Sequence, residues 1–441
     1  MPITEIYAIL MLVAFFGLLM LGMPVALTLA VSGFVFGWLG FGPMLFNLLP
    51  LRIYGVVTSY SLLAIPLFVF MGVALEKSRL AEDLMEVVGR LSGALRGGLG
   101  LGIVFVGVLM GATTGIVGAT VVTLGLLTLP ALLKRGYDKG LSCGVICASG
   151  TLGQIIPPSL ILILLADIMN LSVGTLFAAA VFPGLMLAGI YCVYILVLGL
   201  VRPEMVPAVP AEERALTSTR DLLIKLVRVI APPLGLVVAV LGSIVAGIAA
   251  PTEAAAMGSL GALIVCALGR RLTVGLVVET LRSTARITAM MMFILIGAQV
   301  FALSFRGLQG EQLVHDLFAF LPGGIAADIF FMLALIFVLG FFLEWIEISY
   351  IAVPLFLPIF LAAGVDQVWL AMLICVMLQT SFLTPPFGWA LFFLRSVTPP
   401  VVTTRDIYVG VIPFVLMQLT AVAIVFFAPG LATWLPKAIG W

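Results

Sequence analysis

The sequence predicts an all-α, polytopic membrane protein, because of its composition, the length of its apolar runs and the placement of its few charges. Of its 441 residues, 63% are hydrophobic and 9% are charged, and the mean hydropathy is +1.31. Soluble globular chains are about 45–50% apolar and about 25% charged. Runs this apolar must close their backbone hydrogen bonds internally in lipid, as helices do. A soluble enzyme and a disordered protein are excluded, and a net charge of +1 argues against nucleic-acid binding.

Ten apolar windows of about 20 residues are expected to cross the membrane. They are 4–21, 24–41, 58–75, 141–165, 174–200, 229–249, 251–268, 287–304, 368–394 and 407–428. With the N-terminus outside, eighteen of the 21 Lys and Arg residues lie on the cytoplasmic side, and only Arg52, Arg306 and Lys437 lie outside. Since cytoplasmic loops are rich in Lys and Arg, this orientation is the expected one. Asp167, at the outer end of its span, is expected to be solvated.

Two further apolar regions, 98–134 and 325–361, are expected to form re-entrant helical hairpins. The motif GATTG (111–115) interrupts the first region. Its leading arm, 98–110, would be about 20 Å long as a helix, too short for a hydrocarbon core of about 30 Å. Each hairpin should therefore enter and leave on one side, with its tip near the middle of the membrane.

The remaining segments are expected to lie at the membrane surface or to serve packing. Two amphipathic segments, 76–96 and 272–286, are expected to lie on the inner membrane surface, where their cations favour anionic headgroups. The only histidine, His315, is expected in an amphipathic loop, and the five cysteines in apolar runs are interpreted as packing residues. No HExxH, GxSxG or GxxxxGK[ST] motif occurs, so the chain is expected not to be an enzyme.

The two halves of the chain superpose when the sequence is shifted by 228 positions. The superposed pairs are Pro130 with Pro358, Gly136 with Gly364, Asp138 with Asp366, and Pro157-Pro158 with Pro385-Pro386. Cations flank the first hairpin but not the second, so the two should open on opposite sides. The sequence thus predicts one membrane domain, 1–441, with repeat one at 1–200, a cytoplasmic linker at 202–228 and an inverted repeat two at 229–430. Secondary transporters with a midplane binding site have this architecture.

Each repeat combines a hairpin tip with a proline-broken span, 141–165 or 368–394. A Pro-Pro pair leaves carbonyl groups upstream without donors, and a cation held together with Thr or Ser hydroxyls can replace those donors. The helical arm after each tip directs its N-terminal amides inward, which suits a carboxylate. These elements predict a sodium-coupled symporter of organic acids; the alternative is that the prolines and glycines serve only as kinks and packing notches.

Glu344 and Glu347 lie in the second hairpin tip, within a strongly apolar region. Acidic residues inside a membrane are usually functional, so both are candidates for handling ions or substrate. The alternative is that they cap the helical arm or face a water-filled vestibule.

At these residues the chain resembles the large membrane subunit of tripartite ATP-independent periplasmic (TRAP) transporters. The most specific segments are GATTGIVGA (111–119), LPALLKRGYDKGLSCGVICASGTLGQIIPPS (129–159), AAPTEAAAMG (249–258), FLTPPFGWALFFLRSV (382–397) and TRDIYVGVIPF (404–414). The resemblance implies an elevator-type carrier in a bacterial inner membrane, so the N-terminus, placed outside by the distribution of Lys and Arg, is expected in the periplasm. The carrier would take up a C4-dicarboxylate, keto acid or sugar acid with sodium ions and without other cofactors.

The resemblance also implies partners and site residues. The partners are a four-helix small membrane subunit, expected on a separate chain because few residues precede the first span, and a periplasmic solute-binding protein. The implied sodium-site residues are Thr113, Thr114, Gly150, Thr151, Pro157, Glu344, Glu347, Thr380, Thr384 and Pro385. The candidate substrate-site residues are Gly111, Thr114, Gly115, Thr151, Ser349, Ser381 and Thr384. Many relatives carry an Asp followed by small polar residues in the outer tip, whereas this chain has EWIEIS (344–349).

Two other interpretations remain open at this point. The first is a stand-alone sodium/dicarboxylate symporter or cation/proton antiporter that needs no binding protein. The second is a membrane enzyme or passive scaffold, against which stand the lack of a nucleophile–base pair at membrane depth and the matched Pro-Pro breaks.

Overall fold

The structure is a computed structural model that describes residues 2–91, 95–208, 219–319, 322–385 and 388–441. Within these ranges the chain forms helices and turns and contains no β-strand. Among the described residues, eight helices are long and apolar enough to cross a membrane, or nine if α3 and the η1–α4 segment, which meet at a bend of 50°, are one span. The prediction of an all-α polytopic protein is therefore confirmed.

The helices of the first half have the following bounds: α1 Ile3–Met20, α2 Val25–Phe41, α3 Met44–Val57, η1 Ser61–Leu63, α4 Ala64–Lys77, α5 Leu80–Leu91, α6 Gly98–Thr114, α7 Val117–Lys134, α8 Lys139–Thr151, η2 Leu152–Gln154, α9 Leu160–Met169 and α10 Val173–Val201. Those of the second half are: η3 Pro203–Met205, α12 Thr219–Val245, α13 Pro251–Leu268, α14 Val274–Gly307, α15 Gly310–Ala319, α16 Gly324–Leu339, α17 Trp345–Ala362, α18 Gln367–Ser381, α19 Trp389–Val397, α20 Thr404–Phe427 and α21 Gly430–Ala438.

Several expected boundaries are wrong. The expected surface segment 272–286 and span 287–304 are one helix, α14, because Arg282 and Arg286 end the apolar window without interrupting the backbone hydrogen bonds. His315 lies in a short helix, α15, and not in a loop. The expected linker 202–228 becomes helical at Thr219, where α12 begins. Helices α3 and α21 were not expected at all.

The first arm of the first expected hairpin is also longer than predicted. Helix α6 has 17 residues, because it continues through Gly111 to Thr114 and ends only at Gly115, whose φ is +61°. Glycine adopts this left-handed conformation at little cost. The break therefore lies at the end of the GATTG motif, and α7 begins two residues later.

The turns that precede α8 and α18 are built alike. Gly136 and Gly364 have φ values of +78° and +72°, and each ends the preceding helix in the left-handed region. Asp138 and Asp366 accept hydrogen bonds from backbone N–H groups of the next helix at 2.8 and 2.9 Å, which makes both of them N-caps. The Gly-x-Asp pairs that lie 228 residues apart thus have the same structural role.

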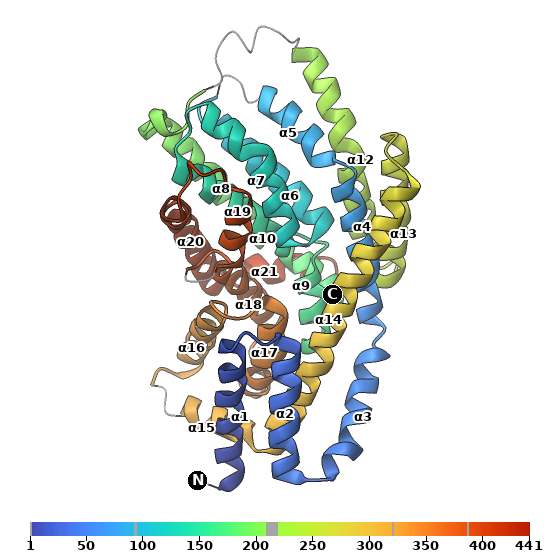
Figure 1. The fold of residues 1–441 in the computed structure, drawn as a ribbon, viewed down its shortest axis with the longest axis vertical. Coiled ribbons are helices and arrows are strands. Elements are labelled where there is room, and N and C mark those ends of the chain that lie inside the picture. Colours follow the sequence, from blue (N-terminus) through green and yellow to red (C-terminus); the bar gives the residue numbers. More distant parts are fainter. Residues whose placement is uncertain (1, 92–94, 209–218, 320–321, 386–387) are drawn as a thin grey trace.

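Two sets of helices pack closely, and they meet where α14 packs against α17 and α4 against α6. In one, α2 lies along α14 and α4 lies along α13, as Figure 1 shows. In the other, α8 packs against α6, α7 and α20, while α18 packs against α16 and α20. The second arm of each hairpin also contacts the broken span of the other repeat, α7 on α19 and α17 on α9. Both expected hairpins and both broken spans therefore belong to one packed group.

A close helix crossing holds the first hairpin against its broken span. A Cβ atom on Gly111 of α6 would collide with the backbone of Gly153 in η2, and the reverse also holds. The Cβ atom of Ser149, one turn earlier, lies 2.6 Å from the position of a Cβ on Gly107. Only glycine permits this approach of the two backbones.

We expect Gly153→Ala to destabilise the protein by about 1–3 kcal/mol, the usual cost of overpacking a well-packed interior. The matched control is Gly189→Ala in α10, where a new Cβ meets nothing within 4 Å. The measurement is the thermal unfolding of both variants in nanodiscs. Equal unfolding temperatures for the two variants would show that the crossing relaxes easily and does not fix the hairpin.

Candidate functional site

Both proline-containing spans are broken helices. Helix α8 ends at Thr151, the turn η2 follows, and α9 resumes only at Leu160. In the second half, α18 ends at Ser381 and α19 begins at Trp389. Pro157 is buried and Pro385 half-buried, while Pro386 lies outside the described residues. Neither break could continue as a helix, since proline removes a backbone donor and clashes with the preceding turn.

Five of the hydroxyls predicted as ligands donate hydrogen bonds to backbone carbonyls three or four residues earlier. The donors are Thr151 (2.9 Å), Thr380 (3.0 Å), Thr384 (2.9 Å), Ser349 (2.6 Å) and Ser381 (2.6 Å). A hydroxyl that donates its single proton still has lone pairs on its oxygen. These side chains can therefore accept a further contact, from a cation or a donor, but have no proton to offer.

The other predicted site residues differ in their packing and burial. Gly150 packs against Val121 of α7. Glu347, in the first turn of α17, is 2% exposed, and its Oε2 atom has no hydrogen-bond partner. The side chains of Thr113 and Thr114, expected at the first hairpin tip, lie outside the described residues.

A cavity of about 160 Å³ lies where the hairpin tips and the broken spans meet. The start of α7, the start of α17, both broken spans and α14 contribute to its wall. Its lining residues are Gly115, Ile116, Val117, Gly118, Gln154, Leu160, Ile287, Met290, Met291, Glu344, Trp345, Ile346, Phe382 and Phe393. Of the described candidates, Gly115 and Glu344 belong to this wall, whereas the five hydroxyl donors do not. The cavity is smaller than the pockets of about 300–1,000 Å³ that hold drug-sized ligands, and suits a small solute.

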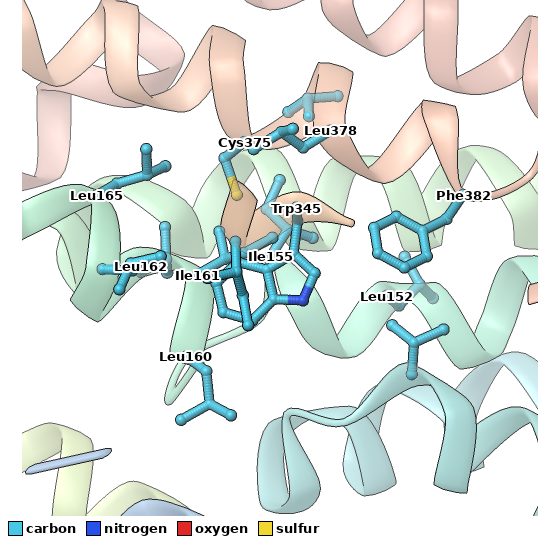
Figure 2. Close-up of a cluster of buried hydrophobic side chains, with 14 of the residues drawn as sticks. Leu152, Ile155, Leu160, Ile161, Leu162, Leu165, Trp345, Cys375, Leu378 and Phe382 are labelled. Atoms are coloured by element: carbon cyan, nitrogen blue, oxygen red, sulfur yellow. The ribbon is translucent and has the colours of Figure 1, made fainter. Parts of the chain in front are cut away.

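Trp345 fixes the start of α17 in this region. Its side chain is 8% exposed and lies in a cluster of buried side chains from several segments, shown in Figure 2. Ile155 and Ile161 of the first broken span, and Cys375 and Leu378 of α18, are in this cluster. The second hairpin tip is thereby anchored to both broken spans.

Two buried glutamines were not among the predicted site residues: Gln154 lines the cavity, and Gln379 contacts a predicted ligand, Thr151. The Nε2 atom of Gln379 donates to Oγ1 of Thr151 at 3.3 Å, and these two residues are 228 positions apart. Gln154 lines the cavity and is 2% exposed. The Oε1 atoms of both glutamines lack partners. An uncharged amide in an apolar window gives little indication of function, although its burial in lipid is costly.

Asp167 is not fully solvated, contrary to expectation. It is partly buried at the end of α9, and it accepts hydrogen bonds from the hydroxyls of Ser59 at 2.8 Å and Tyr350 at 3.5 Å. Ser59 lies in the turn before η1, and Tyr350 lies in α17. This carboxylate thus joins the bend before α4 to a broken span and to the second hairpin.

Comparison with known proteins identifies the family. Residues 12–431 match the family model described as "Tripartite ATP-independent periplasmic transporter, DctM component". The C4-dicarboxylate TRAP transporter large permease protein DctM of Pseudomonas aeruginosa is 30% identical over 408 residues, which cover 91% of this chain and 92% of that protein. The ectoine TRAP transporter large permease protein TeaC of Halomonas elongata is 29% identical over 429 residues, or 96% of this chain and 98% of that protein.

The fold also matches a solved structure. The crystal structure of the Alcanivorax borkumensis YdaH transporter superposes with a TM-score of 0.62 over 92% of this chain and 96% of that one, at 16% identity. That likeness concerns the fold alone. The family match, which spans most of the sequence, confirms the resemblance seen in its motifs: the chain belongs to the family of large permease components of tripartite ATP-independent periplasmic transporters.

Proposed function

We propose that the chain is the permease through which a sodium gradient drives the uptake of a small organic acid across a bacterial inner membrane. A periplasmic binding protein would deliver the solute, and a separate small membrane subunit would complete the complex. The observation that carries this proposal is the meeting of two helix N-termini and two broken spans at one small cavity. Helix N-termini bind anionic groups, because their first backbone amides have no partner within the helix.

Sodium coupling is supported by buried oxygen atoms of the broken spans and the second hairpin tip, of which only those of Gln154 belong to a residue of the cavity wall. The Oε1 atoms of Gln154 and Gln379 and the Oε2 atom of Glu347 are buried without donors. The hydroxyl oxygens of Thr151 and Thr380 have lone pairs to spare. A hard cation takes oxygen ligands of these kinds, and its charge would offset the burial of the Glu347 carboxylate.

An elevator motion of an inverted repeat is supported by the packing. Adding 228 to the bounds of α7 gives those of α17. The close approach of Gly111 to Gly153 has a counterpart, because a Cβ on Gly340 would collide with the side chain of Ser381, 228 positions after Gly153. We propose that the group of hairpins and broken spans moves as one body against the group of α2, α4, α13 and α14. The distribution of Lys and Arg supports a periplasmic N-terminus.

The test is uptake by proteoliposomes that contain the chain together with its small subunit. With the cognate binding protein outside, we expect uptake to require an inward sodium gradient and to stop when potassium replaces sodium. Omission of the binding protein should abolish uptake, since delivery then fails. Transport with sodium and solute alone, unaffected by the binding protein, would contradict the proposal and favour a stand-alone symporter. Uptake driven by a proton gradient in potassium would contradict the sodium coupling alone.

The names of the relatives leave the solute open. The Pseudomonas aeruginosa relative is named for C4-dicarboxylates and the Halomonas elongata relative for ectoine. These two solutes share a carboxylate but differ in net charge, so the charge of the cavity bears on which class the permease accepts.

A further inference from the structure

The two helix N-termini at the central cavity differ in charge. Helix α7 begins there with Val117 and Gly118 and has no acidic residue in its first turn. Helix α17 begins there too, but Glu344 is its N-cap residue and Glu347 lies in its first turn. The positive end of the α7 dipole is thus free to attract an anion, whereas the acids of α17 oppose the positive end of their own helix.

The wall carries acceptors on two segments. Glu344, at the start of α17, is a carboxylate, and Gln154, in η2, has an Oε1 atom that is buried without a partner. Among the described lining residues there is no Lys, Arg or His that could neutralise the Glu344 carboxylate.

Aromatic residues make up another part of the cavity wall. Trp345, Phe382 and Phe393 contribute to the same wall, and the ring of Phe393 lies against Gly118 at the start of α7. Aromatic rings attract organic cations through their faces, and carboxylates strengthen that preference. A wall of this composition is suited to an ammonium or amidinium group and disfavours a second carboxylate.

We propose that the cavity selects a zwitterionic carboxylic acid, with its carboxylate directed at the N-terminus of α7 and its cationic nitrogen group directed at Glu344. This inference rests on the proposed function and narrows its substrate class. A dicarboxylate would place its second negative charge beside the half-buried Glu344, and such like-charge pairs are unfavourable.

Substrate binding by the permease itself tests the proposal, without the binding protein, whose own selectivity would mask that of the cavity. The chain with its small subunit, in nanodiscs at saturating sodium chloride, is titrated with ectoine, a zwitterionic amidine, and with succinate, a dianion. We expect ectoine to bind about tenfold or more tightly than succinate, the effect of one charge-assisted contact. Glu344→Gln should weaken ectoine binding by a similar factor and leave succinate binding unchanged or stronger. Glu204→Gln, at an exposed position in η3, is the matched control and should bind both solutes as the wild type does.

Three results would overturn the inference. One is tighter binding of succinate than of ectoine by the wild type. Another is a Glu344→Gln variant with unchanged preference but weakened sodium binding, which would assign Glu344 to the ion. The third is binding of neither solute at saturating sodium. None of these results affects the proposed function, whose own test is sodium-driven uptake by the complete system.

Discussion

Replacing Glu347 by glutamine is expected to stabilise the sodium-free protein and to remove the stabilisation that sodium gives to the wild type. The carboxylate is 2% exposed and its Oε2 atom has no hydrogen-bond partner. A buried polar group without a partner costs about 1–3 kcal/mol, and more when it is charged. Glutamine keeps the shape of the side chain and removes the charge, so the variant should unfold at a higher temperature in potassium buffer.

In sodium buffer, the wild type should instead have the higher unfolding temperature. If Glu347 is a sodium ligand, the ion binds the folded wild type and raises its unfolding temperature, by the equivalent of about 2.7 kcal/mol at a concentration of 100 Kd. The Gln variant should show little of this increase and should lose sodium-driven uptake. The measurement is thermal unfolding in nanodiscs over a series of sodium concentrations at constant ionic strength, with Glu204→Gln as the control for a carboxylate lost elsewhere.

Two outcomes would contradict a sodium role for Glu347. In one, both proteins respond to sodium equally, so the carboxylate only complements the start of α17, an effect of about 1 kcal/mol or less. In the other, the unfolding temperature of the wild type does not change with sodium but rises at low pH, and its uptake has a steep pH dependence that the Gln variant lacks. That result would make Glu347 a proton carrier.

Most of the helices could be predicted from the sequence, because their signals are local. Gly136 and Asp138 could be matched to Gly364 and Asp366, since a left-handed turn and an N-cap demand those residue types. Hydropathy did not predict the helix boundaries where charged residues lie inside a continuous helix. The charges near the start of α14 end the apolar window, although the helix itself runs from Val274 to Gly307.

The site was less predictable, because its residue pairs come from distant segments. The bond between Gln379 and Thr151 joins residues 228 apart, and no local pattern distinguishes Gln154 or Gln379 from a polar packing residue. The sequence also does not predict which acceptors the Thr and Ser hydroxyls donate to. Thr380 and Ser381 donate to their own helix, so their oxygens, and not their protons, face any further ligand.

The largest effect on transport is expected from a covalent link between the two proposed bodies. Asp167 at the end of α9 accepts a hydrogen bond from Ser59 at 2.8 Å. Helix α9 belongs with the hairpins, because α17 packs against it. Ser59 precedes η1 and α4, and α4 packs along α13 and α14. An elevator motion must separate these two side chains in every transport cycle.

A short bifunctional thiol crosslinker applied to the Ser59→Cys/Asp167→Cys variant is therefore expected to abolish uptake, and cleavage of the linker to restore it. Each single variant, treated in the same way, controls for loss of the hydrogen bond and for reaction at the five native cysteines. Crosslinking within the hairpin group, between cysteines introduced at Gly125 and Leu394, which lie against each other outside the cavity wall, should leave the motion of that group free. Full uptake after complete linkage of positions 59 and 167 would mean that α9 and the bend before α4 remain together during transport. The moving body would then have to exclude α9, and the cavity would have to open by displacement of a hairpin tip alone.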